Sequence, residues 1–209
     1  YEQIFISPED MRVDPIFNPE RALEQTGKIY FYNNYILLNE LHEGIHIIDN
    51  NDPSNPQNLG FINIPGNVDI AVSNDNLYAD NYADLLTINI ADITNPQLIC
   101  RDENVFTKHW FNENNGYFAY LNPTDRILKV DCSDPNFKND RFGNDVIFLA
   151  EDVNGGFDPQ NNSNNSGVGG SLARFTIASK HLYVINDQYE IIAFDINNPS
   201  KPQRTESVY

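Results

Sequence analysis

The feature that most constrains the fold is a phrase that recurs along the 209-residue chain. Its clearest copy runs from Gly44 to Pro56 and consists of an apolar strand, an acid and a turn rich in Asn and Pro. The acid or amide that ends the strand serves as an anchor for aligning the copies. The four anchors are Asp49, Asn89, Asp131 and Asp195, which are spaced by 40, 42 and 64 residues.

Each copy divides into four predicted strands joined by short turns. The predicted strands are 28–33, 35–40, 44–49 and 57–65; then 68–73, 77–82, 85–90 and 97–104; then 105–111, 117–121, 126–131 and 142–150; then 172–178, 181–186, 190–195 and 203–209. Short turns without crossover helices predict antiparallel meanders. The first two spacings match the period of about 40 to 45 residues of a four-stranded propeller blade.

We therefore predict an all-β fold, a β-propeller or partial propeller of about four four-stranded antiparallel blades. The blades are assigned to residues 27–66, 67–104, 105–150 and 171–209, with a polar insertion at 151–170. Four blades would close if the segment Glu2–Ser7 completed the last one. We favour a fragment of a larger ring, because residues 203–209 stop in the outer-strand position, and an open end would allow strand-edge pairing or oligomerisation.

Residues 1–26 form an N-terminal extension that does not share the repeat. Glu2–Ser7 is predicted to be a short strand. Pro19–Gln25 begins with a proline, has an acid in its first turn and is followed by Gly27, which predicts one short helix.

The repeated anchors Asp49, Asn89, Asp131 and Asp195 favour a structural role. Each precedes an Asn/Pro turn, where a side-chain oxygen can accept a backbone N–H bond in an Asx turn. The amide Asn89 keeps the acceptor without the charge, which argues against a cation site built from these positions.

His42–His46 matches the H-E-x-x-H pattern of zinc proteases. That chemistry needs a helix, which brings both histidines to one face. Gly44 and the alternating flanks predict strands instead, and positions four apart in a strand are separated by about 13 Å. We expect His42 in a turn and His46 in a strand, and we assign no catalytic residue.

The polar insertion 151–170 is the part of the chain that does not repeat. Asp152, Asn154 and Asp158 offer oxygen ligands in a Gly-rich loop and are a weak Ca²⁺ candidate, because the full 12-residue calcium pattern is missing. Gly167–Ser171 leads into a strand rather than a helix, so it does not indicate a phosphate site. No other metal or cofactor is predicted.

Composition narrows the choice of partners. The formal net charge is −17, from 30 acids and 13 bases, which disfavours nucleic acid. No run of 18 apolar residues is present, so no transmembrane segment is predicted. The two cysteines, Cys100 and Cys132, allow one disulfide or two free thiols, and the count does not decide between them.

The repeated phrase resembles the LVIVD repeat of bacterial and archaeal cell-surface proteins, which are predicted to form β-propellers. The match is carried by Ile45–Asp49, Leu86–Asn89 and Ile192–Asp195. Longer stretches resemble Bacteroidetes surface lipoproteins: Gly27–Tyr30, Gly44–Asp49, Phe61–Asp69, Leu77–Asp80 and Gly169–Phe175. The resemblance implies an extracytoplasmic location, at the cell surface or in the periplasm, with a lipid anchor in the precursor.

From the residues and this resemblance we expect a non-enzymatic repeat protein that binds a protein or glycan partner on the face bearing 151–170. Two alternatives remain open: a hydrolase with its site at the propeller channel mouth, and a structural component of the envelope or surface layer. The sequence does not name the ligand or the oligomeric state.

Overall fold

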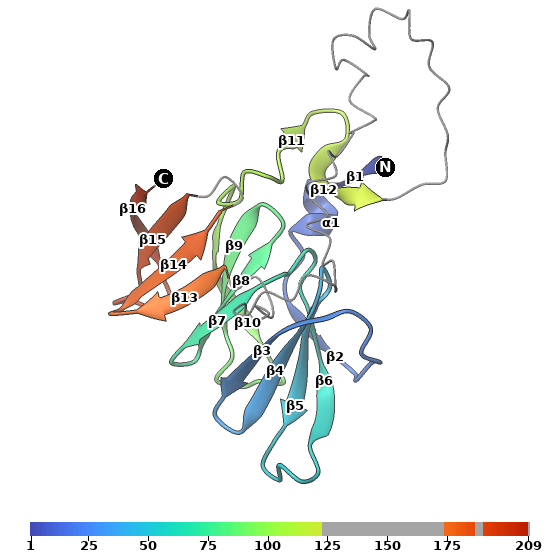
Figure 1. Cartoon of the computed structure of the whole chain (residues 1–209), viewed down its shortest axis with the longest axis vertical. Helices are drawn as coiled ribbons and strands as arrows, with labels where there is room; N and C mark the ends of the chain where they lie inside the picture. The colour runs from blue at the N-terminus through green and yellow to red at the C-terminus, as the bar shows by residue number, and fades with distance from the viewer. Residues whose placement is uncertain (123–173, 187–189, 209) are drawn as a thin grey trace, which may run out of the picture.

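A computed structural model describes residues 1–122, 174–186 and 190–208 of the chain. This part is all-β, with antiparallel sheets and one short helix (Figure 1). The elements are β1 (Glu2–Ile6), α1 (Pro8–Met11), β2 (Ile16–Asn18), β3 (Thr26–Tyr32), β4 (Tyr35–Glu40), β5 (Gly44–Asp49), β6 (Gln57–Asn63), β7 (Ile70–Ser73), β8 (Asn76–Asn81), β9 (Asp84–Asn89), β10 (Gln97–Asp102), β11 (Phe111–Asn112), β12 (Gly116–Asn122), β13 (Phe175–Ala178), β14 (His181–Ile185), β15 (Ile191–Asp195) and β16 (Gln203–Val208).

Three of the four sheets are meanders formed by individual repeats. The repeat-1 sheet has the order β2-β6-β5-β4-β3, the repeat-2 sheet β10-β9-β8-β7 and the repeat-4 sheet β13-β14-β15-β16. In each of them the fourth strand skips one residue in its pairing with the third, at Leu59, Ile99 and Thr205. The strand boundaries predicted for these three repeats agree closely with the observed ones, and the shared bulge shows that the copies are equivalent residue by residue.

The repeat-2 sheet lies between the other two repeat sheets. Alternate side chains of its strands point to opposite faces, so Ile70 and Leu77 pack against the repeat-1 sheet while Ala71 and Tyr78 pack against the repeat-4 sheet. The first strands β3, β7 and β13 are neighbours. Repeat 4 therefore packs directly on repeat 2, and no closed ring of sheets is present among the described residues.

The described part of the third repeat, residues 105–122, adopts a different arrangement from the one predicted, and the predicted strands 126–131 and 142–150 lie outside the described residues. Its strands β11 and β12 join β1 in a separate small sheet of order β1-β12-β11, which lies over one end of the repeat sheets (Figure 1). In the other repeats the second strand pairs with the third strand of its own repeat, whereas β12 pairs with β1. The suggestion that Glu2–Ser7 completes the last blade is thus wrong.

The predicted strand 105–111 is also wrong, since only Phe111 and Asn112 are extended and paired. Val105 and Phe106 are instead buried in the apolar cluster between the repeat-2 and repeat-4 sheets, and Phe106 N donates to Ala83 O at 2.9 Å. These apolar side chains fill a gap between sheets, and burial of this kind does not require strand pairing.

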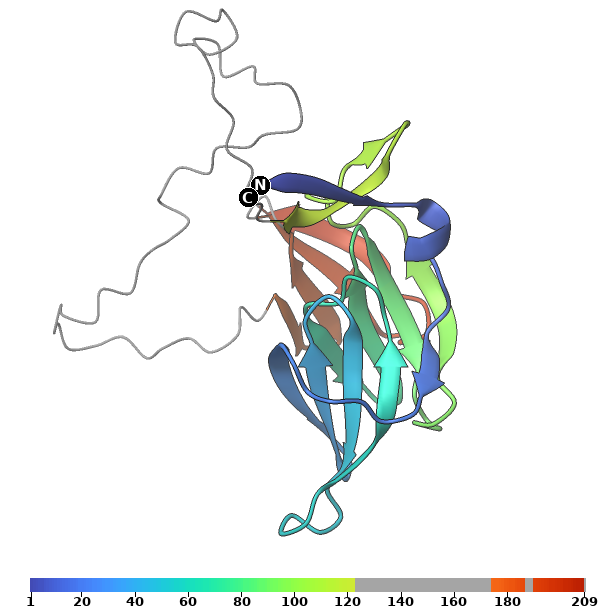
Figure 2. The ribbon, with the colours of Figure 1, turned by 90° about the vertical axis from the view of Figure 1, so that its right-hand side faces the viewer.

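The helix predicted at Pro19–Gln25 does not form. This segment crosses the outer face of the repeat-1 sheet, passing from β2 to β3 (Figure 2). The backbone N–H groups of Glu24 and Gln25 donate to the Glu40 carboxylate, and Leu41 N donates to Gln25 O at 2.9 Å. Seven residues make a helix that is marginal in isolation, and these tertiary bonds outweigh it.

The short helix lies at Pro8–Met11 instead. Ser7 is its N-cap, accepting from Asp10 N at 3.0 Å, and Pro8 occupies the first turn. These are ordinary start signals for a helix. Met11 is fully buried against Tyr82 and Tyr117, so the helix ties the small sheet to the turn between β8 and β9.

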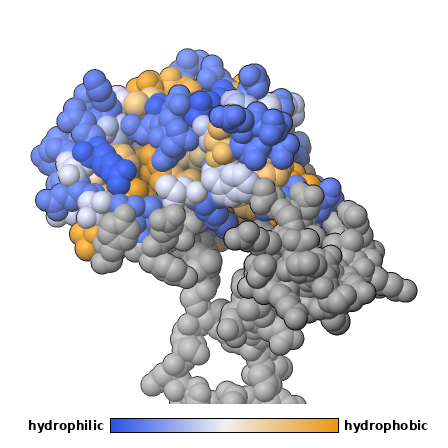
Figure 3. All heavy atoms as spheres, turned by 90° about the horizontal axis from the view of Figure 1, so that it is seen from above, coloured by the Kyte–Doolittle hydropathy of each residue, from blue (hydrophilic) through white to orange (hydrophobic). Residues whose placement is uncertain are grey.

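The surface is largely hydrophilic at the end that carries the small sheet, with hydrophobic atoms showing between the polar ones (Figure 3). Within the described ranges, no helix is long and apolar enough to cross a membrane.

Candidate functional site

Two polar assemblies stand out, a buried network between the sheets and an open pocket beside it. The buried network gathers where β3, β7 and β13 begin. Lys28 Nζ lies 2.8 Å from Asp69 Oδ1, and Asp69 Oδ2 accepts backbone bonds from Arg174 and Phe175, the latter at 2.8 Å. Lys28 Nζ also donates to Ile70 O at 2.9 Å. One carboxylate therefore joins the first strands of three repeats.

A second carboxylate extends the network. Asp80 Oδ1 accepts from Asn67 Nδ2 at 2.8 Å and from the backbone N–H groups of Val68 and Asp69 at 2.7 and 3.0 Å. The Arg174 guanidinium forms an ion pair with Asp80. Complete burial raises the pKa of Asp80, and the charge of Arg174 opposes that shift.

This network favours a structural role. Asp69 and Asp80 are buried, and their oxygens are occupied by donors from the protein itself. A buried ion pair whose partners are well bonded holds geometry more than it adds stability. This network therefore sets the three sheets in register.

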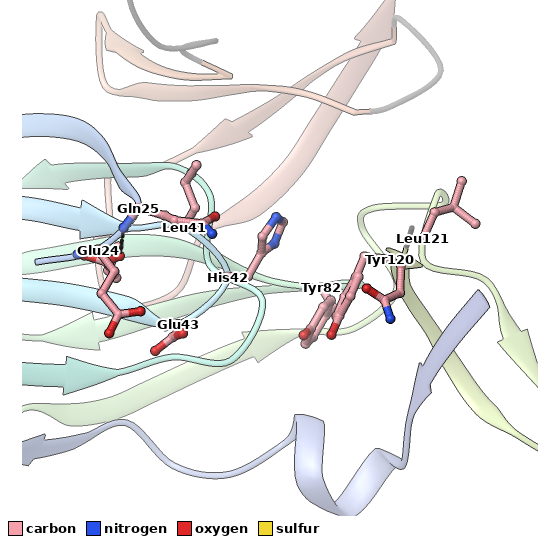
Figure 4. A pocket seen from close by; sticks show the side chains of 10 residues that line it. Glu24, Gln25, Leu41, His42, Glu43, Tyr82, Tyr120 and Leu121 are labelled. Atoms are coloured by element: carbon pink, nitrogen blue, oxygen red, sulfur yellow. Dashed lines mark hydrogen bonds between the residues drawn. The ribbon is translucent and has the colours of Figure 1, made fainter. Parts of the chain in front are cut away.

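The pocket lies between the repeat-1 sheet and the small sheet, and its volume is ≈ 560 Å³ (Figure 4). Pockets of 300 to 1,000 Å³ are typical of small-molecule sites. The lining residues come from the segment before β3, the β4–β5 turn, the β8–β9 turn and the end of β12. They are Glu24, Gln25, Glu40, Leu41, His42, Glu43, Tyr82, Tyr120, Leu121 and Asn122.

Aromatic side chains line one side of the pocket. The rings of His42 and Tyr120 are stacked, with centroids 6.3 Å apart and planes inclined by 26°. Tyr82 is buried, while Tyr120 is 44% exposed. Partial burial, together with the charges of Lys108 and Arg174, lowers the pKa of His42, so its imidazole is neutral at pH 7.

Acidic side chains line the other side. Figure 4 shows Glu24 and Glu43 on the side of His42 away from the two tyrosines. Glu43 forms an ion pair with Arg21, whose guanidinium carbon lies 4.5 Å from the centre of the Phe61 ring. Burial raises the pKa of Tyr82, with smaller contributions from Tyr120 and Glu43, so its hydroxyl remains a hydrogen-bond donor.

Beneath the pocket, the lining residue Glu40 pairs with the buried His46, and Glu40 Oε2 lies 3.1 Å from His46 Nε2. Burial by itself would raise the pKa of Glu40, but backbone bonds from Gln25 and Glu24 and the bond to His46 outweigh it and lower that pKa. His46 packs edge-on against Phe61, with ring centroids 4.9 Å apart. The Glu40 carboxylate, although it lines the pocket, is thus occupied by donors of the protein itself.

The structure separates the two histidines of the H-E-x-x-H pattern. His42 lies in the β4–β5 turn with φ 67°, and His46 lies in β5 without contact to the pocket. Within the described residues, no group of three His, Cys, Asp or Glu side chains is placed to hold a metal.

Three of the four anchors are described, and each accepts a backbone bond from the residue two positions on. Asp49 Oδ1 accepts from Asn51 N at 2.8 Å, Asn89 Oδ1 from Ala91 N at 3.1 Å and Asp195 Oδ1 from Asn197 N at 2.7 Å. This is the geometry of an Asx turn.

Several candidates from the sequence lie outside the described residues. They are Asp131, Cys132, the insertion 151–170 and its oxygen ligands Asp152, Asn154 and Asp158. Cys100 is described and lies half-buried in β10.

Sequence reasoning missed the pocket residues Glu24, Tyr82 and Tyr120. Glu24 belongs to the segment that was predicted to be helical, and Tyr120 belongs to a strand that was expected in a third blade. The positive φ of Tyr82, 52°, places a large aromatic at a position where Asn or Gly is usual, but this conformation cannot be read from the sequence.

Comparison of the chain with family models, with curated proteins and with solved structures finds no match.

Proposed function

We propose that this chain is a non-enzymatic, repeat-built binding protein that takes a glycan in the pocket between the β4–β5 turn and β12. The observation that carries the proposal is the pocket of ≈ 560 Å³ with an aromatic side and an acidic side. Following the LVIVD resemblance, the proposed location is the cell surface or periplasm, with a lipid anchor in the precursor and blades arranged as in a propeller.

The radial arrangement is supported by how the repeat sheets pack. The first strands β3, β7 and β13 are neighbours, and the sheets stack face to face through two apolar clusters. In repeats 1 and 2, the turn between the second and third strands (β4–β5 and β8–β9) carries His42 and Tyr82, respectively. The two turns lie at the same end of the sheets. In radial folds, loops gathered at one end of a rigid scaffold commonly carry binding residues.

The chemistry of the pocket suits a sugar. Tyr120 and His42 present ring faces, while Glu24 and Glu43 accept hydrogen bonds and the tyrosine hydroxyls and Asn122 amide donate them. A sugar ring presents apolar faces together with hydroxyls that both donate and accept. A protein partner is the alternative, but a concave pocket of this size suits a small group better than a flat interface.

Binding is favoured over hydrolysis by the partners of the pocket side chains. A catalytic His or carboxylate is normally oriented by a third group within hydrogen-bond reach. In the described part of the chain, the His42 ring stacks on Tyr120, Glu43 pairs with Arg21 and Glu40 is occupied by backbone donors.

The test is an array of immobilised glycans probed with the labelled full chain, alongside an array of peptides. We expect glycan features that Tyr120→Ala and Glu24→Ala each reduce about five- to thirtyfold, since each removes a contact worth about 1–2 kcal/mol. Phe111→Ala is the matched control, because Phe111 is an exposed aromatic of the small sheet that does not line the pocket. Binding that is confined to peptides, or unaffected by both pocket variants, contradicts the glycan proposal, as does turnover of a glycoside substrate that depends on Glu24 or Glu43.

A further inference from the structure

The acids and bases around the pocket indicate what charge its ligand carries. The charged side chains that line the pocket are Glu24, Glu40 and Glu43, and no lysine or arginine is among the lining residues. Two of these carboxylates already have partners in the protein. Glu40 accepts backbone N–H bonds and lies against His46, and Glu43 forms an ion pair with Arg21.

The carboxylate of Glu24 differs from the other two. Glu24 is exposed, and its backbone N–H donates to Glu40. Among the described residues, no hydrogen bond or ion pair involves the Glu24 carboxylate itself. Figure 4 shows Glu24 and Glu43 on the same side of His42. The acidic side of the pocket therefore carries a negative charge that no base of the described chain neutralises.

Two bases act on the pocket from outside its lining. Lys108 and Arg174 lower the pKa of His42, but neither of them lines the pocket. Arg174 is itself paired with Asp80. Because its pKa is lowered, His42 is neutral at pH 7 and adds no positive charge between the acidic and the aromatic side. The lining therefore favours a cation over an anion.

The aromatic side of the pocket attracts a cation as well. A ring face carries the negative part of the aromatic quadrupole, and an ammonium group within about 6 Å of the ring centre is drawn to it. Tyr120 is 44% exposed and stacks on the neutral His42 ring. A positively charged group in the pocket is thus attracted both by Tyr120 and by Glu24.

We propose that the ligand of the pocket is an amino sugar whose amine is free, with its ammonium group beside the Glu24 carboxylate and its ring against Tyr120. This inference rests on the proposed function and names the class of glycan. An N-acetylated sugar lacks the positive charge, and a uronic acid is repelled by the acidic side. Because Glu24 and Tyr120 are partly in solvent, the amine should gain about a three- to thirtyfold higher affinity from the two contacts together.

The test is isothermal titration calorimetry of the full chain with three tetrasaccharides that share one linkage, built from glucosamine, N-acetylglucosamine or glucose. We expect the glucosamine tetramer to bind about three- to thirtyfold more tightly than the other two. Raising the salt concentration from about 0.02 M to about 0.5 M should reduce this preference, because salt screens the ion pair with Glu24.

Glu24→Gln isolates the ionic contact, because it removes the charge and keeps an acceptor. It should lower the affinity for the glucosamine tetramer more than the affinity for the glucose tetramer, so that the preference for the amine falls about two- to fivefold. Glu9→Gln is the matched control. It makes the same change of charge at an exposed acid of α1 that does not line the pocket, and should leave the preference intact.

The possible results distinguish this inference from the proposed function. Equal binding of the three tetramers, all weakened by Tyr120→Ala, overturns the amino-sugar inference and leaves the glycan proposal standing. Failure of all three to bind, together with a silent glycan array, overturns both. A preference that survives in Glu24→Gln contradicts the role of Glu24. A lysine peptide that binds as tightly as the glucosamine tetramer shows that the pocket recognises an amine without a sugar, and likewise overturns the inference.

Discussion

Lys28 Nζ lies 2.8 Å from Asp69 Oδ1, and these two residues occupy the same position in successive repeats. The equivalent residue of repeat 4 is Arg174, which donates its backbone N–H to Asp69 and pairs with Asp80 through its guanidinium. The same repeat position thus carries a basic residue in repeat 1 (Lys28), an acidic residue in repeat 2 (Asp69) and a basic residue in repeat 4 (Arg174). Their attraction at the start of β3, β7 and β13 sets the order and register of those sheets.

Replacing the central acid should strongly destabilise the stack. Asp69→Ala leaves Lys28 without its carboxylate and removes the acceptor of three backbone N–H groups, those of Ile70, Arg174 and Phe175. We expect a loss of about 3–5 kcal/mol in the free energy of unfolding, measured by urea denaturation. Asp52→Ala, at an exposed turn acid, is the control and should change stability by no more than about 1 kcal/mol. Equal losses for the two variants contradict a central role for Asp69.

The repeat anchors should tolerate an amide but not an apolar side chain. Asp49→Asn keeps the acceptor for Asn51 N, as Asn89 does naturally, so its effect on the free energy of unfolding should be within about 0.5 kcal/mol. Asp49→Ala removes the acceptor and should cost about 1 kcal/mol. Thermal unfolding of the two variants distinguishes them, and a large loss for Asp49→Asn indicates that the charge itself is needed.

The buried Glu40 should make stability depend on pH in the acid range. Its pKa is lowered below the ordinary 4.5 by bonds from Gln25, Glu24 and His46 that outweigh desolvation. A carboxyl with a lowered folded-state pKa stabilises the fold above its unfolded pKa, and this contribution is lost as pH falls through the folded pKa. Stability should therefore decline below about pH 4.5.

Glu40→Gln isolates this contribution. The amide cannot accept from all three donors, so we expect a loss of about 1–3 kcal/mol at pH 7 and a flatter stability profile between pH 5 and 3. Denaturant titrations at several pH values measure both effects. Glu9→Gln, at an exposed acid of α1, provides the control. A variant that retains the native acid dependence shows that another carboxyl is responsible.

Gly44, in the middle of the H-E-x-x-H pattern, should not tolerate a side chain. Its φ is +145°, and a Cβ atom would lie 2.1 Å from Ile62 O in the paired strand β6. Backbone strain and this clash together should cost about 2–4 kcal/mol in Gly44→Ala, measured by chemical denaturation. At Gly27 the nearest atoms belong to the side chains of Asn39 and Leu41, which can move, so Gly27→Ala should cost less. The reverse ranking contradicts the backbone explanation.

The pairing of β1 with β12 should depend on the N-terminal strand. Ile4 is paired with Tyr120, and Ile4→Pro removes a backbone donor from the centre of β1. We expect faster hydrogen exchange of the β12 amides, with little change in β5 or β9. Val13→Pro, just after α1, lies outside every strand and is the control. Unchanged exchange in β12 shows that β1 does not hold it.

The sequence alone determined the local structure of the repeats. Alternating apolar residues predict strands because side chains in a strand point to opposite faces, and the Asx turn at each anchor needs only its own side-chain oxygen and a nearby N–H. Both signals are contained in short stretches such as Gly44–Asn51, so the strands of repeats 1, 2 and 4 were predictable. The placement of His42 in a turn and of His46 in a strand was predictable for the same reason.

Only the tertiary structure decided which sheets are neighbours and where the pocket lies. Burial of apolar surface is non-directional, so the apolar faces alone do not decide that repeat 4 packs directly on repeat 2. The path of Pro19–Gln25 depends on bonds to Glu40, and the pairing of β12 depends on β1, which is more than 100 residues away in the sequence. His42, Tyr82 and Tyr120 come from three such segments, and they form one pocket because packing between the sheets brings those segments together.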